Sequence, residues 1–143
     1  MVHRVATSLA ALLAGVGLVS ASMAPPPNDG GSAPVGLGHP GAVQFDLATA
    51  TASTIAGCGV NDSVDVWYRF RAPTRQIYRF ETTGDAGIDT TLALFGFCPA
   101  GGPGSGTWIV CNDDTPYRDA TATLGSRIDQ ELVGNQVVLI RVA

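Results

Sequence analysis

The chain has 143 residues, enough for one domain with a modest core. It carries twelve acidic residues against eight arginines and contains no lysine. Because phosphate backbones are bound by clustered positive charge, this acidic composition excludes nucleic acid as a partner.

Residues 1–21 have the layout of a secretory signal. Arg4 gives a basic start, residues 6–19 are apolar or small, and Ala21 offers a small residue for cleavage. The apolar run is shorter than the ~20 residues that a membrane-spanning helix needs. We therefore expect a secreted or extracytoplasmic protein, in the periplasm or at the cell surface, with no stable membrane span after the signal is removed.

Residues 22–41 are rich in proline and glycine, which predicts a linker or an extended arm. The next segment, residues 42–143, alternates in hydropathy with a period of two and contains no convincing helical stripe. Within it, strands are predicted at residues 43–47, 53–56, 64–71, 78–81, 90–97, 107–111, 120–124, 128–132 and 137–142. Short strands separated by Gly, Pro, Asn and Asp predict an all-β domain, an antiparallel β-sandwich of jelly-roll-like form.

Three cysteines in an exported chain indicate one disulfide and one remaining thiol. Cys98 and Cys111 flank a glycine-rich segment and could pin its two ends together. A loop of that length would contribute about 3 kcal/mol in the chain-entropy picture. Cys58 would then be unpaired, either buried or available to another chain.

The composition argues against most catalytic sites. Outside the signal, His39 is the one histidine, and it lies in the proline-glycine arm. A nucleophile–histidine site or a zinc site is therefore not expected. A pair of carboxylates could still hydrolyse a glycosidic bond, which keeps a carboxylate-only glycoside hydrolase as an alternative.

Calcium is the metal that this sequence favours, because hard cations take oxygen ligands and need no histidine. The candidate ligands form three groups, Asn28 with Asp29, Asp62 with Asp65, and Asp113 with Asp114. All three groups have an alternative role, since Asp and Asn side chains also cap turns by accepting hydrogen bonds from nearby backbone N–H groups. For Asp113 and Asp114, a turn after a strand is the favoured interpretation.

Aromatic side chains beside polar groups suit contact with sugars or peptides. Trp67, Trp108 and Tyr117 are the candidates for such a ligand surface. The competing interpretation is that both tryptophans belong to the core.

Several motifs occur together in one order: DVWYRFRAP at residues 65–73, a Tyr-x-Phe strand, IDTTLALF at 88–95, CNDD at 111–114, SRI at 126–128 and IRVA at 140–143. With PPND at residues 26–29, this series resembles the bacterial pre-peptidase C-terminal (PPC) domain family, over residues 43–143. The resemblance implies a β-sandwich that serves secreted enzymes as a non-catalytic accessory domain. Its partners would be extracellular protein or polysaccharide.

The resemblance also implies a calcium site at Asn28, Asp29, Asp62 and Asp65, although this chain lacks the glutamates that relatives carry upstream in the arm. Relatives often pair a cysteine at the position of Cys58 with one in the Tyr-x-Phe strand, which here has none. They also continue past the Ile-Arg-Val segment into one more strand. Either the sandwich lacks its last strand, leaving an open edge that could dock another chain, or the sequence is a fragment of a longer protein.

Three functions follow from these observations. The first is a secreted, non-catalytic accessory or binding domain of unknown ligand, for which the resemblance implies stabilisation by Ca²⁺. The second is a structural module that assembles through an open edge strand or through Cys58. The third, a carboxylate-only glycoside hydrolase, requires two carboxyl groups that face one cleft.

Overall fold

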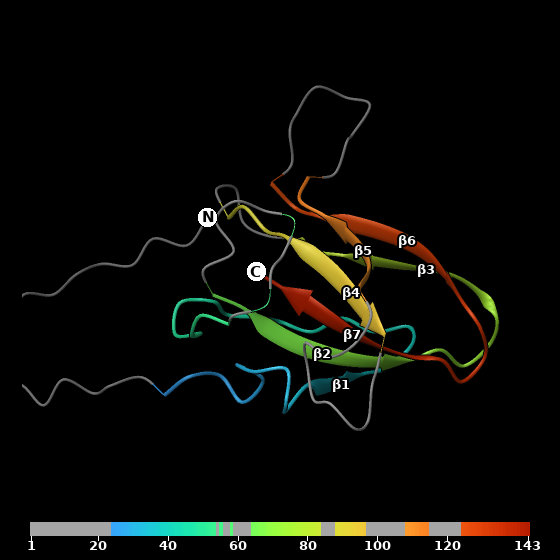
Figure 1. Cartoon of the computed structure of the whole chain (residues 1–143), viewed down its shortest axis with the longest axis horizontal. Helices are drawn as coiled ribbons and strands as arrows, with labels where there is room; N and C mark the ends of the chain where they lie inside the picture. The colour runs from blue at the N-terminus through green and yellow to red at the C-terminus, as the bar shows by residue number, and fades with distance from the viewer. Residues whose placement is uncertain are drawn as a thin grey trace, which may run out of the picture.

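The computed structural model describes residues 24–53, 55, 58, 64–83, 88–96, 108–114 and 124–143, and these residues form strands and connecting segments without a helix. Figure 1 shows the strands, which are β1 (Val35–Leu37), β2 (Val66–Arg71), β3 (Gln76–Glu81), β4 (Leu92–Gly96), β5 (Trp108–Asn112), β6 (Arg127–Leu132) and β7 (Val137–Val142). Within the same residues, no helix is long and apolar enough to cross a membrane.

The strands form two sheets. Five of them make one sheet in the order β1-β2-β7-β4-β5, and β3 and β6 make a second, two-stranded sheet. All pairs are antiparallel except β1 with β2. This arrangement confirms the predicted all-β class and a β-sandwich.

The main core lies between the two sheets. Alternation along β2 sends Val66, Tyr68 and Phe70 to the inner face. From the facing sheet, Tyr78 and Phe80 meet Phe70, with ring centroids 5.0 and 5.3 Å apart. The central strands and β6 complete this inner core with Leu92, Leu94, Ile128, Leu132, Val138, Ile140 and Val142.

A smaller cluster covers the opposite, outer face of the five-stranded sheet. It consists of Trp67, Ala93, Phe95 and Leu139, with Ile55 and Cys111 packed against it. The strand registers place Trp67, Arg141, Ala93 and Cys111 in one row across β2, β7, β4 and β5. The outer cluster is therefore built around a charged residue, whereas the inner core is apolar.

Two predictions about the first half of the chain need correction. The predicted linker or arm contains β1, which pairs with β2 and packs Val35 and Leu37 against the inner core. Residues 43–47 form no strand, although Phe45 and Leu47 do pack on that core. The Asp46 carboxylate accepts a hydrogen bond from the Ala48 N–H, which turns the chain instead of extending it.

The other early strand prediction, at residues 53–56, is also wrong at its described positions, 53 and 55, which are not in a strand. The predicted strand at 120–124 lies, except for Leu124, outside the described residues. The expected open edge at the end of the chain is wrong as well. β7 lies in the middle of its sheet and is paired on both sides, with β2 and with β4.

Candidate functional site

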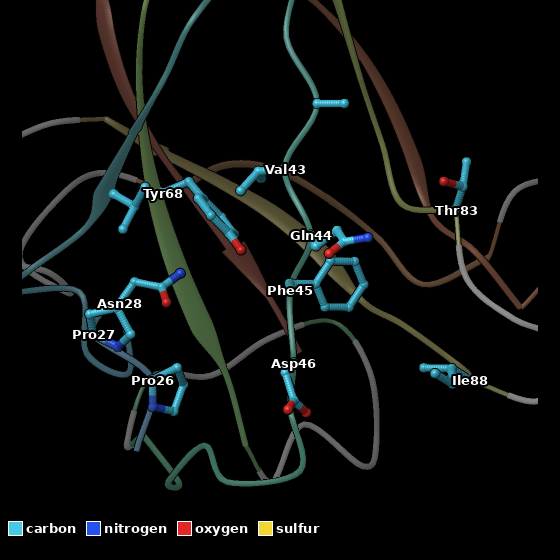
Figure 2. A pocket seen from close by; sticks show the side chains of 12 residues that line it. Pro26, Pro27, Asn28, Val43, Gln44, Phe45, Asp46, Tyr68, Thr83 and Ile88 are labelled. Atoms are coloured by element: carbon cyan, nitrogen blue, oxygen red, sulfur yellow. The ribbon is translucent and has the colours of Figure 1, made fainter. Parts of the chain in front are cut away.

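A hollow of about 1100 Å³ surrounds the irregular segment at residues 42–46. We call it the segment hollow. Figure 2 shows this segment running between Pro26, Pro27 and Asn28 of the arm on one side and Thr83 and Ile88 on the other. Its lining combines apolar surface with a few amide, hydroxyl and carboxylate groups, which is the usual composition of a ligand site.

Tyr68 and Asn28 form the arm side of the hollow. The Tyr68 ring comes from the inner face of β2 and is 3% exposed, and Figure 2 shows its hydroxyl pointing out toward the segment. Burial raises the pKa of this hydroxyl, and a side-chain hydrogen bond with Asn28 partly offsets the rise. Tyr68 therefore stays neutral at physiological pH and offers a hydroxyl group rather than a charge.

Gln44, Phe45, Thr83 and Ile88 form the other side. Figure 2 shows the Phe45 ring and the Gln44 amide both directed toward Thr83 and Ile88. Gln44 and Thr83 are exposed, as is Ile88, while Phe45 is partly buried against the inner core. A second hollow of about 200 Å³ shares Phe45 and Thr83 and reaches the core at Leu92.

The hollow was not predicted. Sequence reasoning assigned residues 43–47 to an edge strand, and it gave no role to Tyr68 beyond the alternation of its strand. The segment has no strand ladder with β3, yet it lines the smaller hollow together with the end of that strand. No local sequence signal marks such an arrangement.

Asn28 and Asp29, the first pair of predicted calcium ligands, are used to fix the arm. The Asn28 amide donates to the Trp67 carbonyl over 3.2 Å, and the Asn28 carbonyl accepts from the Trp67 N–H over 2.8 Å. The Asp29 carboxylate accepts hydrogen bonds from the Thr51 N–H and hydroxyl. The pair thus ties the arm to β2 and to the segment around Thr51.

Asp65 lies at the start of β2, where it is fully buried. Its carboxylate accepts hydrogen bonds from the Trp67 indole N–H and the Arg141 Nε, both over 2.7 Å, and from the Ser53 hydroxyl. The acid therefore neutralises Arg141 beneath the outer cluster. A cation at Asp65 would have to share the carboxylate with that guanidinium.

Asp113 and Asp114 follow β5 at a bend, as the turn interpretation predicted. The Thr91 hydroxyl donates to the Asp113 carboxylate over 3.0 Å, and the Ser126 hydroxyl donates to the Asp113 carbonyl over 2.7 Å. Asp62 lies outside the described residues. Among those that are described, no three His, Cys, Asp or Glu side chains gather as metal ligands would.

The predicted Cys98–Cys111 disulfide is wrong in its pairing. Cys111 is bonded to Cys58, with the two Cα atoms 6.0 Å apart and a sequence separation of 53. Because Cys111 lies on β5 and packs against the outer cluster, it meets the segment that approaches this face before β2. Cys98 lies outside the described residues, and Cys58 is not a spare thiol for assembly.

The tryptophans of the predicted aromatic surface differ in their exposure to solvent. Trp67 is fully buried and cannot touch a ligand, which corrects that part of the prediction. Trp108 on β5 is 53% exposed and remains available for contact. Tyr117 falls outside the described part of the chain.

Comparison of the chain with family models, with curated proteins and with solved structures finds no match.

Proposed function

We propose that this protein is a secreted, non-catalytic accessory domain that binds polysaccharide in the segment hollow. The observation that carries the proposal is the grouping of Phe45, Gln44 and Thr83 around one open hollow. An aromatic ring beside amide and hydroxyl groups matches the apolar C–H faces and hydroxyl groups of a sugar.

The extracytoplasmic location is supported by two features of different kinds. Residues 1–21 have the layout of a secretory signal. The Cys58–Cys111 disulfide is typical of a protein that folds in an oxidising compartment.

The structural partners of the acidic side chains support an accessory role. Asp65 neutralises Arg141, while Asp129 and Glu131 pair with arginines on the surface of the smaller sheet. Asp29, Asp46 and Asp113 accept hydrogen bonds that fix arms and turns. These six carboxylates have structural partners, so the proposal assigns them no part in acid–base chemistry.

Affinity electrophoresis tests the proposal, with native gels that contain xylan, hydroxyethyl cellulose or glycol chitin. We expect at least one of the three to retard the secreted protein. The double variant Gln44→Ala/Phe45→Leu should weaken retardation about tenfold, because one hydrogen bond and one ring contact together are worth about 1.5 kcal/mol.

Gln76→Ala is the matched control, since Gln76 is exposed on β3 and does not line the hollow. Its retardation should equal that of the wild type. Equal retardation of the double variant, or the absence of retardation in all three gels, would contradict the proposal.

Calcium at Asn28, Asp29, Asp62 and Asp65 stays a separate prediction. A thermal melt in EDTA and then in millimolar Ca²⁺ tests it, because a ligand that binds the native state alone raises the melting temperature. A rise that Asp29→Ala abolishes would support the site. An unchanged melting temperature would leave these residues in the structural roles described above.

A further inference from the structure

Two arginines stand side by side on the outer face of the five-stranded sheet. Arg69 and Arg71 alternate with buried residues along β2, and both are exposed. Together with Leu37 and Val137 they line a small hollow of about 250 Å³. This hollow lies on the face of β2 opposite to Tyr68 and is separate from the segment hollow.

The charge of these two arginines is not neutralised by the described part of the chain. Arg75, Arg79, Arg127 and Arg141 each form an ion pair with an acidic side chain. Arg69 and Arg71 have no such pair among the described residues. Within the described part of the chain, two adjacent positive charges thus remain without an acidic partner.

The strands on either side place no acidic side chain beside the two arginines, and β1 places a glycine beside Arg69. On β7, Leu139 is paired with Arg69 and Val137 with Arg71. On β1, Gly36 is paired with Arg69, and Gly38 follows one residue after β1 ends. A Cβ atom added to either glycine would meet no atom within 4 Å. Among the described residues, β1 therefore has no side chain at position 36 to cover Arg69.

We propose that Arg69 and Arg71 bind the carboxylates of an extended acidic peptide whose acids occupy alternate positions. An extended chain rises about 3.4 Å per residue, so acids two positions apart have the same spacing as two arginines two positions apart on β2. Each guanidinium presents a planar fork that matches one carboxylate. β1 is the edge strand in the described sheet order, so a peptide could lie along it.

Fluorescence anisotropy tests this proposal with the secreted protein and a labelled peptide in which Glu alternates with Thr. A peptide of the same composition with its Glu residues in one block tests the spacing, and an alternating Gln-Thr peptide tests the charge. We expect the alternating Glu-Thr peptide to bind most tightly, and its affinity to fall as salt is added.

The double variant Arg69→Gln/Arg71→Gln should bind the alternating Glu-Thr peptide at least about tenfold more weakly, as expected when charge-assisted hydrogen bonds are lost. Arg75→Gln is the matched control, because Arg75 is also exposed but is paired with Glu131; it should bind like the wild type. A second variant, Gly36→Val, fills the open space beside Arg69 and should weaken binding without lowering the melting temperature.

Unchanged affinity in the double arginine variant would overturn the proposal, as would equal affinity for the Gln-Thr peptide. Polygalacturonate, added as a competitor, separates a peptide from an acidic polysaccharide. If it binds more tightly than the peptide and loses affinity in the same variants, the partner is an acidic polysaccharide and the peptide assignment is wrong.

Discussion

The two faces of the five-stranded sheet are stabilised in different ways. On the inner face, β3 and β6 bring a second layer of apolar side chains, and burial of aliphatic and aromatic groups suffices. On the outer face, four buried hydrophobic residues surround the Asp65–Arg141 ion pair, beside the Cys58–Cys111 disulfide. The comparison teaches that a small cluster, with no second sheet over it among the described residues, depends on specific polar and covalent links.

The largest expected effect comes from breaking the buried ion pair. Asp65→Ala leaves Arg141 charged and without its carboxylate, which should lower the free energy of unfolding by about 3–5 kcal/mol. Urea unfolding measures the loss. The double variant Asp65→Ala/Arg141→Met should be more stable than Asp65→Ala alone, because it removes the uncompensated charge. If the double variant is instead the less stable of the two, the ion pair does not govern the outer cluster.

Removal of the disulfide should have the next largest effect. The double variant Cys58→Ser/Cys111→Ser frees a loop of more than fifty residues in the unfolded chain, which should cost about 2–4 kcal/mol of stability. Urea unfolding in the absence of reductant checks this. Dithiothreitol should lower the stability of the wild type and leave the variant unchanged. Cys98→Ser serves as the control, and a comparable loss in that variant would contradict the observed pairing.

A conservative change in the inner core should cost less than either of these. Ile140→Val removes one buried methylene group between the two sheets, with an expected loss of about 0.5–1.5 kcal/mol. The same denaturant experiment gives the value. A loss as large as that of Asp65→Ala would show that the inner core tolerates change no better than the outer cluster does.

The smallest effect concerns the surface of the smaller sheet. A hydrogen bond from Arg79 lowers the pKa of the Asp129 carboxyl below its ordinary value of 3.8, and the charge of Arg127 acts in the same direction. A lowered folded-state pKa gives stability that is present above pH 3.8 and is lost as the pH falls below it. Wild-type stability should therefore fall slightly more steeply in acid than that of Asp129→Asn. Parallel pH profiles of urea unfolding would contradict this role.

The strands of the sandwich were largely predictable, and their partners were not. Alternation is a local property, so residues 137–142 matched β7 and the Tyr-x-Phe pattern found β3. The central position of β7 depends on which strands pack around it, and alternation carries no information about that. The same limit explains the disulfide, because Cys111 meets Cys58 through the order of strands and not through proximity in sequence.

The candidate site was less predictable than the fold. Asn28 and Asp29 in the arm and Asp65 before β2 were predicted as calcium ligands, and hydrogen bonds and an ion pair give them structural roles. Gln44 and Phe45 were not identified as candidate site residues, because the alternating pattern of their segment predicted an ordinary edge strand. Trp67 was a candidate because tryptophan often contacts ligands, but its side chain is buried in the outer cluster. That burial follows from the packing of the sheet and not from the local sequence.

The most direct test of the proposed binding function is an NMR titration of the ¹⁵N-labelled protein with a soluble oligosaccharide of whichever polysaccharide retards it. We expect the amide shifts to change at Gln44, Phe45 and Thr83 and in the side-chain amide of Gln44, which line the segment hollow. Changes confined to β5, around the exposed Trp108, would contradict the account and move the binding surface to that strand.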